Sequence, residues 1–327
     1  MKHAFRPFAA ILCLMLLAGV PASAATKTLR LGTDQVRDFF TTVALREFAD
    51  QVARETGGGV RIDVYDGGQL GQEKACIEQV QFGALDMAKT SLSPLSEFVP
   101  GLNVMSFPYL FRSMDHMWNV LLGDIGRELL DQAGEAQMVA LCWLDSGSRN
   151  FYGKKPLRDL PDFAGLKIRV PESRIMMGMV DALGGHATPM PSNDVYSSLQ
   201  TGVCDAAENT IPRYLDMSHQ EIAPFLTIDM HNIVPETLLI SRASWSALTP
   251  DEQGAMRKAA AALTGNTRGK LQSVEEEVLA RLVKEFKVTV IRPDAAVIAR
   301  LRRACQPIYD EYGGEYADIV GRIEAVK

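Results

Sequence analysis

Short strand-like segments alternate with helical segments along this chain, and this alternation restricts its fold more than any other feature. In residues 60–64, three β-branched residues alternate with Arg61 and Asp63, as in a strand with one buried face. The preceding segment, 41–56, has helical apolar spacing and ends at glycines 57–59, which favour the left-handed backbone that follows a helix. Strands alternating with helices predict an α/β fold.

The same patterns predict the remaining elements. Strands are expected at 29–32, 85–90, 138–144, 166–170, 225–234, 237–242 and 288–291, with a further buried strand ending at 206–209. Helices are expected from residue 72, at 116–132, 173–183, around 196–199, at 250–286 and from 294 to the C-terminus. Packed coil with short helices is expected at 94–114 and a turn at 188–191, with Ser192 or Asn193 capping the next helix.

The N-terminus has the pattern of an export signal. Lys2 and Arg6 precede an apolar stretch, 8–20, that is too short to span a bilayer, and residues 22–24 form a small-residue cleavage site. We therefore expect residues 1–24 to be a cleaved signal peptide and the mature protein to be soluble and exported. No later stretch reaches the roughly 20 apolar residues of a transmembrane helix.

The chain is acidic, with 34 Lys and Arg residues against 40 Asp and Glu residues. Removing Lys2 and Arg6 with the signal leaves 32 against 40, a net charge of −8. This excess argues against nucleic acid and against an anionic membrane surface, because both partners attract clustered basic residues. A mature chain of about 300 residues suggests two lobes rather than one core. We expect the protein to be a monomer.

Four cysteines follow the signal, Cys76, Cys142, Cys204 and Cys305, and none forms a Cys-x-x-Cys pair. An oxidising compartment permits one disulfide, but a chain of this length does not need one. Buried free thiols are the expected state.

Two arginines stand near predicted strand ends. Arg169 alternates with apolar residues and points away from their buried face, and Arg149 follows 138–144, at the expected end of that strand. Ligands bind beyond the carboxyl ends of strands in open α/β sheets, so two guanidinium groups there could bind a carboxylate. The alternative is that both arginines are solvated or paired with nearby acids such as Asp145 and Asp162.

A search for catalytic motifs finds almost nothing. The chain has no Gly-x-Gly-x-x-Gly after a strand, no phosphate-binding loop and no His-Glu-x-x-His. His219 and Glu221 have the spacing of half a deaminase motif, but its Pro-Cys-x-x-Cys partner is missing. The histidines are too scattered for a metal site. We therefore expect no metal, no cofactor and no enzymatic activity, with an enzyme that lacks a known motif as the open alternative.

Seven short motifs occur in a defined order: Gly-x-x-Gly-x-Glu (68–73), Phe-Pro-Tyr-Leu-Phe-Arg (107–112), Gly-x-Arg-Asn (147–150), Gly-Leu-Lys-Ile-Arg-Val-Pro-Glu-Ser (165–173), Thr-Pro-Met (188–190), Val-Tyr-x-x-Leu-Gln-Thr-Gly-Val-x-Asp (195–205) and Glu-Asn (208–209). Together they resemble the DctP-type periplasmic solute-binding proteins of tripartite ATP-independent periplasmic (TRAP) transporters. The resemblance covers essentially the whole mature chain. The combined order is specific, although each motif alone is not.

The resemblance implies ligand-binding roles for eight residues. Arg169 matches the arginine that pairs with the substrate carboxylate, Arg149 a second arginine there, and Asn209 the amide that completes the clamp. Positions that face the rest of the ligand are matched by Asp34, Glu73 and Ser91 in the first lobe and by Glu236 in the crossover between lobes. Ser192 stands where some members place an aromatic ring, and its small size leaves room for hydroxyls.

Some of these positions also have a purely structural explanation. Glu73 falls in the first turn of a predicted helix, where the helix dipole favours a carboxylate. Asn209 could cap a turn, and Glu236 could be a surface acid. The sequence alone leaves these alternatives open.

The family pattern implies two α/β lobes that are joined by crossing strands and bridged by the long helix 250–286. Lobe I is expected to comprise 25–147 with 235–274, and lobe II 148–234 with 275–327, including the C-terminal helix. The lobes would close on the ligand about hinges. The small and large TRAP membrane subunits would then recognise the closed form.

The resemblance leaves the ligand open among small organic acids. Three positions opposite the clamp, Asp34, Glu73 and Glu236, are acidic, so they would repel a second carboxylate but accept several hydroxyls. The segment 207–209 with His231, Pro235 and Glu236 also resembles members that bind hexuronates and related sugar acids. We predict a sugar acid such as glucuronate or galacturonate. The alternatives are a C4-dicarboxylate, an ABC-type binding protein of similar design, and an exported enzyme that uses one of these acids.

Overall fold

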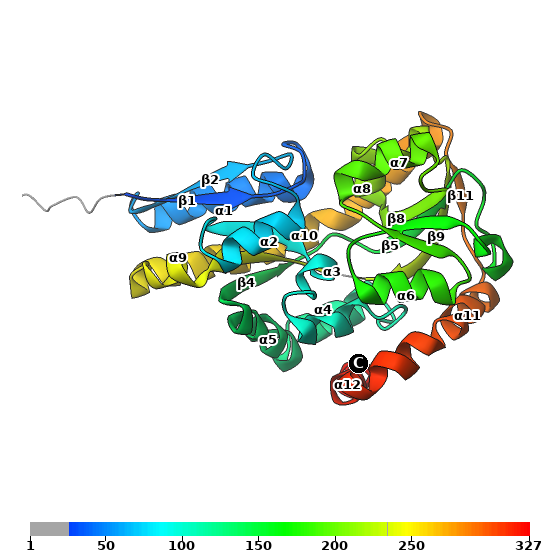
Figure 1. The fold of residues 1–327 in the computed structure, drawn as a ribbon. Coiled ribbons are helices and arrows are strands. Elements are labelled where there is room, and N and C mark those ends of the chain that lie inside the picture. Colours follow the sequence, from blue (N-terminus) through cyan, green and yellow to red (C-terminus); the bar gives the residue numbers. More distant parts are fainter. Residues whose placement is uncertain (1–25, 234) are drawn as a thin grey trace, which may run out of the picture.

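The computed structural model describes residues 26–233 and 235–327 and contains two β-sheets with helices packed around them (Figure 1). The predicted signal peptide, 1–24, lies outside the described residues. Within the described part the predicted α/β class is confirmed, because strands and helices alternate from one end to the other. None of the described helices is long and apolar enough to cross a membrane.

The first body is built around a five-stranded sheet in the order β2-β1-β3-β10-β4. Its strands are β1 (Lys27–Gly32), β2 (Val60–Tyr65), β3 (Met87–Ser91), β4 (Met138–Leu144) and β10 (Glu236–Ser241). Its helices are α1 (Phe40–Glu55), α2 (Glu73–Gln81), α3 (Leu92–Leu95), α4 (Met114–Leu121), α5 (Asp124–Asp131) and α9 (Arg242–Ser246), with the 3-10 helices η1 (Pro100–Ser106) and η2 (Gln132–Ala136). β1 is parallel to β2 and β3, whereas β10 is antiparallel to β3 and β4.

The second body is built around a six-stranded sheet in the order β11-β9-β5-β8-β6-β7. Its strands are β5 (Arg149–Gly153), β6 (Lys167–Val170), β7 (His186–Pro189), β8 (Ala206–Thr210), β9 (Phe225–Asn232) and β11 (Thr289–Ile291). Its helices are α6 (Arg174–Ala182), α7 (Val195–Thr201), α8 (Ile211–Asp216) and α11 (Ala295–Ala304), with the 3-10 helices η3 (Leu160–Phe163), η4 (Ser192–Asp194) and η5 (His219–Glu221). β5 is antiparallel to β8 and β9, and β6 is parallel to β7 and β8.

Three segments connect the two bodies. β4 leads into β5, and β9 leads into β10, so the chain crosses between the sheets twice. The third connection is the helix α10 (Pro250–Lys284), which begins with a capping box between Thr249 and Glu252. α10 buries Leu263 in the core of the first body and Leu282 in that of the second, and Figure 1 shows it running behind both.

The C-terminal helix α12 (Gln306–Ala325) brings the end of the chain back to the first body (Figure 1). Ile308 and Ile323 are buried in the same apolar cluster as Trp118 of α4. On the surface, Arg322 pairs with Glu128 of α5 at 2.6 Å. α12 also contacts α6 of the second body, so it packs against both.

The prediction of buried free thiols is confirmed. All four cysteines that follow the signal are free and buried. Burial raises the pKa of the Cys76 thiol to about 11, and the nearby carboxylates of Asp34 and Glu73 act in the same direction.

Strand directions bring the functional edges of both sheets together. In the first sheet β3 ends and β10 begins at one edge, where Ser91 pairs with Glu236. In the second sheet β8 ends and β5 begins at one edge, where Thr210 pairs with Arg149. Residues from both edges line one pocket, so these edges face each other.

Arg149 was expected to end the strand 138–144, and that prediction was wrong. Arg149 is the first residue of β5, in the second sheet. It still lies beside the carboxyl end of β8, because β5 runs antiparallel to β8. Arg169, in contrast, lies near the carboxyl end of β6 as predicted.

Four other local predictions were also wrong. The expected turn at 188–191 includes the end of β7, which pairs with β6 along all four of its residues. The expected helix 116–132 is two helices, α4 and α5, separated at Gly123, and the C-terminal helix is interrupted at Cys305 before Pro307. Neither Ser192 nor Asn193 caps α7, because η4 leads directly into it without a side-chain cap.

Candidate functional site

A polar pocket lies between the facing edges of the two sheets. The structure brings all eight residues selected from the sequence to its walls. The first body contributes Asp34, Glu73, Ser91 and Glu236, and the second contributes Arg149, Arg169, Ser192 and Asn209. Lys89 and Arg213 also line it. Their common position is observed, whereas their roles in binding remain predictions.

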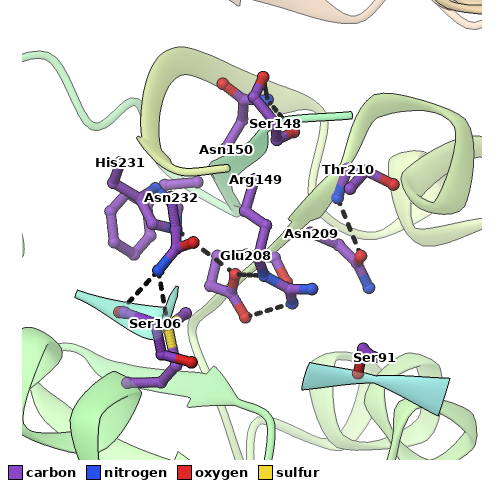
Figure 2. Close-up of polar contacts among 12 residues, drawn as sticks. Ser91, Ser106, Ser148, Arg149, Asn150, Glu208, Asn209, Thr210, His231 and Asn232 are labelled. Atoms are coloured by element: carbon purple, nitrogen blue, oxygen red, sulfur yellow. Dashed lines mark hydrogen bonds and ion pairs between the residues drawn. The ribbon is translucent and has the colours of Figure 1, made fainter. Parts of the chain in front are cut away.

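Arg149 is held by the buried carboxylate of Glu208, and neither of the acids suggested from the sequence pairs with it. Its Nε and Nη2 donate to the two carboxylate oxygens, the second at 2.7 Å (Figure 2). Burial alone would raise the pKa of Glu208, but Arg149 and His231 lower it to about 2. The ionised Glu208 therefore keeps the guanidinium in one orientation.

Arg169 is 2% exposed and is oriented by the backbone. Its Nε and Nη2 donate to the carbonyl oxygen of Met190, at 3.1 and 2.7 Å, and its Nη1 lies 4.0 Å from Glu208. One edge of the guanidinium is thus occupied, which directs the remaining N–H groups toward the pocket. Arg149 and Arg169 share the single carboxylate of Glu208, so these three side chains together carry a net charge of one positive unit.

Asn209, on β8, lies beside Arg149 (Figure 2). Its Oδ1 accepts a hydrogen bond from the backbone N–H of Thr210 at 2.8 Å. The oxygen of Asn209 therefore has the local structural role that was the alternative to ligand binding. That bond orients the amide so that the Nδ2 group remains as a donor on the pocket side. Two guanidinium groups and one amide make a multi-donor site that suits a carboxylate.

A buried network stands behind the arginines. His231 contacts Asp229 through Nδ1 at 3.1 Å and Glu208 through Nε2 at 3.4 Å, and its ring stacks on Phe151. Tyr109 donates its hydroxyl to Asp229 at 3.1 Å. Burial alone would lower the pKa of His231, but Asp229 and Glu208 raise it to about 9. The imidazolium therefore ties the two acids together.

The opposite end of the pocket holds three carboxylates around one buried ammonium. Lys89 Nζ lies 2.7 Å from Glu236, 3.5 Å from Glu73 and 3.6 Å from Asp34. Glu73 also accepts the backbone N–H and the hydroxyl of Ser91, at 2.7 and 2.9 Å. Glu236 is buried and is therefore no surface acid.

A second cation reaches the same end from the second body. Arg213 on α8 donates to Asp34 Oδ2 at 2.7 Å and to Asp216 at 2.7 Å. Burial alone would raise the pKa of Asp34, but Arg213 and then Lys89 hold it below the ordinary value. The residues predicted from the sequence at this end are mostly acids, and the structure adds two cations, Lys89 and Arg213.

Three buried polar atoms in this pocket have no hydrogen-bond partner among the described residues: Asp34 Oδ1, Gln35 Oε1 and Ser192 Oγ. Gln35 donates instead through Nε2 to Glu236, at 3.2 Å. The described residues contain no group of three or more His, Cys, Asp or Glu that could hold a metal ion. The pocket is arranged for polar recognition.

Sequence reasoning missed Lys89, Arg213, Glu208 and the partners of His231. Lys89 lies two residues before Ser91, so strand periodicity could have placed both on one face. Glu208 stands next to Asn209 in a motif that was noticed for the amide alone. No local pattern indicates that Arg213 belongs to the pocket, because its partner there, Asp34, is 179 residues away in the sequence.

Comparisons with known proteins identify the family of this chain. The model of a protein family described as bacterial extracellular solute-binding protein, family 7 (DctP), matches residues 36–315. A solute-binding protein of Chromohalobacter salexigens is 36% identical over 281 residues, which cover 84% of this chain and 82% of that protein.

Two solved structures of TRAP periplasmic solute-binding proteins are similar throughout. The protein of Pseudomonas putida F1, with bound D-glucuronate, has a TM-score of 0.89 and 34% identity, covering 92% of this chain and 97% of that one. The protein of Xanthobacter autotrophicus Py2, with bound β-D-galacturonate, has a TM-score of 0.88 and 37% identity, covering 91% and 100%.

Proposed function

This chain belongs to family 7 of the bacterial extracellular solute-binding proteins, the DctP family, and we propose that it captures a hexuronate for a TRAP transporter. The observation that carries the proposal is the division of the pocket into a donor end and an acceptor end. Arg149, Arg169 and Asn209 stand at the donor end, and Asp34, Glu73 and Glu236 at the acceptor end. A hexuronate has one carboxylate and several hydroxyls, so it matches both ends.

The donor end suits one carboxylate. Arg149 and Arg169 share Glu208, which neutralises one of their two charges and leaves one for the ligand. Both guanidinium groups are already oriented by protein partners, so little side-chain freedom is lost on binding. The buried ion pair would be bidentate or bridging, which a planar guanidinium permits and an ammonium does not.

The acceptor end suits hydroxyl groups better than a second carboxylate. Lys89 and Arg213 are the cations there, but they are shared among Asp34, Glu73, Glu236 and Asp216. Two positive charges against four negative charges leave an excess of acid. A C4-dicarboxylate would place its second charge in this negative environment, which like-charge repulsion disfavours. Sugar hydroxyls would instead donate to the carboxylates.

The two bodies would act as lobes that close over the ligand. Lobe I would comprise 25–147 with 235–274, and lobe II 148–234 with 275–327. Each end of the pocket belongs mainly to one body, so a ligand that bridges both ends favours the closed arrangement over the open one. We propose that the export signal delivers the protein to the periplasm, where the two TRAP membrane subunits recognise the closed form.

A thermal-shift screen with purified protein tests the proposal. The panel should contain glucuronate, galacturonate, aldonates, C4-dicarboxylates and keto acids. A ligand at 100 times its Kd should raise the free energy of unfolding by about 2.7 kcal/mol, a readily measured shift. Shifts with succinate or malate and none with any sugar acid would contradict the hexuronate assignment and favour the dicarboxylate alternative.

The same material separates a binding protein from an enzyme. Glucuronate should be recovered unchanged after long incubation with the protein, as followed by NMR. Conversion of the ligand would instead assign the acids Asp34, Glu73 or Glu236 to acid–base chemistry.

A further inference from the structure

Lys89 is a buried cation whose position in the first sheet is unusual. Its side chain is 1% exposed, and it lies on β3 between Ala88 and Thr90. β3 stands between β1 and β10, and each neighbour delivers a carboxylate to the same edge. Asp34 follows the end of β1, and Glu236 begins β10 opposite Ser91. The Lys89 ammonium thus lies between acids from two other segments, the residues that follow β1 and the start of β10.

The contacts of Lys89 orient these acids differently. The shortest, 2.7 Å to Glu236 Oε1, is an ion pair with the length of a charge-assisted contact. Asp34 and Glu73, at 3.6 and 3.5 Å, are held mainly by other groups, Arg213 and Ser91 respectively. Glu236 therefore depends on Lys89 most.

Two buried acceptors near Lys89 lack a hydrogen bond within the described part of the chain, although Asp34 Oδ1 lies 3.6 Å from the Lys89 ammonium. Asp34 Oδ1 and Gln35 Oε1 are buried, line the pocket, and have no hydrogen-bond partner among the described residues. Buried acceptors of this kind are costly to leave without a donor. Gln35 donates to Glu236, and Glu236 pairs with Lys89. The orientation of Gln35 therefore also depends on the Lys89 ammonium.

We propose that Lys89 is the positioning residue of the acceptor end, an inference that rests on the proposed function. Its ammonium contacts Glu236, Asp34 and Glu73 together and holds them so that their free oxygens accept sugar hydroxyls. Lys89 acts through these acids and sets the preference for a polyhydroxy tail over a second anionic group.

The charged groups around Lys89 determine how the site would respond to the loss of its ammonium. Asp34, Glu73 and Glu236 face Lys89 directly, Arg213 and Asp216 stand behind Asp34, and the Cys76 thiol lies near Asp34 and Glu73. Burial already raises the pKa of Glu236, and Lys89 opposes that rise. Without the ammonium, the pKa of Glu236 would rise further, because nothing would oppose the effect of burial and of the neighbouring acids.

The test is the pH dependence of glucuronate binding, measured by calorimetry between pH 6 and pH 8. The wild-type Kd should stay constant within about twofold. Lys89→Met should bind at least about tenfold more weakly at pH 6 and should recover part of this loss by pH 8. The direction follows because ligand hydroxyls favour the ionised carboxylate, which must release its proton. Lys258→Met, which breaks an exposed pair with Glu55, is the matched control and should behave as wild type.

A paired variant covers the case in which Lys89→Met does not fold. Lys89→Met with Glu236→Gln removes one cation and one acid together, and it should bind glucuronate at least about tenfold more weakly than wild type and without pH dependence. Wild-type affinity in either variant, or a loss in Lys89→Met that is equal at every pH, would overturn the inference. If the wild-type protein bound no sugar acid at all, the proposed function would fail instead.

Discussion

Arg213 and Asp34 form an ion pair across the pocket, with Arg213 Nη2 2.7 Å from Asp34 Oδ2. Arg213 belongs to α8 of the second body, and Asp34 follows β1 of the first. Both side chains are buried, and Arg213 also donates to the backbone oxygen of Asp34 at 3.4 Å. The protein itself therefore supplies part of the contact that holds the two bodies together, before any ligand bridges them.

Removing this pair should favour separation of the bodies. Arg213→Met is expected to weaken glucuronate binding by roughly 2 kcal/mol, about 30-fold in Kd, near the lower end for close charge pairs. Small-angle scattering should show a larger radius of gyration in the ligand-free variant. Asp216→Asn, which removes the partner of Arg213 within the second body, should change both quantities much less. Equal effects of the two variants would argue against a role for the cross-body contact.

Arg169 is expected to be indispensable at the donor end. Arg169→Ala should weaken binding by roughly 2–5 kcal/mol, because it leaves a buried ligand carboxylate without its partner. Arg169→Lys should also bind poorly, since an ammonium cannot hold the Met190 carbonyl and a carboxylate in the same geometry. Calorimetry measures both, with Arg300→Lys, at an exposed pair with Asp159, as control. Wild-type affinity in Arg169→Lys would exclude a guanidinium clamp.

The buried His231 should make folding stability depend on pH. Its pKa in the folded protein, about 9, exceeds the ordinary value of 6.5. The protonated imidazole therefore stabilises the fold fully below pH 6.5, and this contribution is lost as the pH rises to about 9. A shift of this size corresponds to roughly 3 kcal/mol. Denaturant unfolding at several pH values should show the decline in wild type and in His186→Gln, an exposed control, but not in His231→Gln.

Glu275 on α10 should act in the opposite sense to an ordinary stabilising acid. One of its carboxylate oxygens is buried without a hydrogen-bond partner among the described residues, and burial with the nearby Asp145 raises its pKa to about 7. A raised carboxyl pKa means that stability is full below the ordinary value of 4.5 and is lost as the pH rises to about 7.

Glu275→Gln should remove that loss and stabilise the protein above pH 7 by up to roughly 3 kcal/mol. Glu276→Gln, at an exposed neighbouring position, should have little effect. The melting temperatures of the three proteins at pH 5 and pH 8 decide the matter: a Glu275→Gln variant no more stable than wild type at pH 8 would contradict the assignment.

Gly147 next to this acid leaves no room for a side chain. Its φ of +91° is a backbone conformation that favours glycine, and a Cβ there would lie 2.4 Å from Glu275 Oε1. Gly147→Ala should therefore destabilise the fold, and pairing it with Glu275→Ala should recover the steric part but not the backbone part. Full recovery in the double variant would show that the backbone conformation costs nothing.

The sequence by itself determined the local features of this protein. Periodicity predicted the strand at 60–64 and the helix that precedes it, because alternation and helical spacing depend only on neighbouring residues. The ordered motifs led to the family and to eight residues that the structure brings to one pocket. Such patterns are local, so they can be seen without knowing how the strands are arranged.

The tertiary structure alone decided which charges meet. Arg149 joins Glu208 because β5 lies antiparallel to β8, and Lys89 meets Asp34 and Glu236 because β3 lies between β1 and β10. Arg213 reaches Asp34 only because the two sheets face each other across the pocket. Strand order and direction depend on contacts between distant segments, and the free energy of a buried charge depends on partners that no local pattern contains.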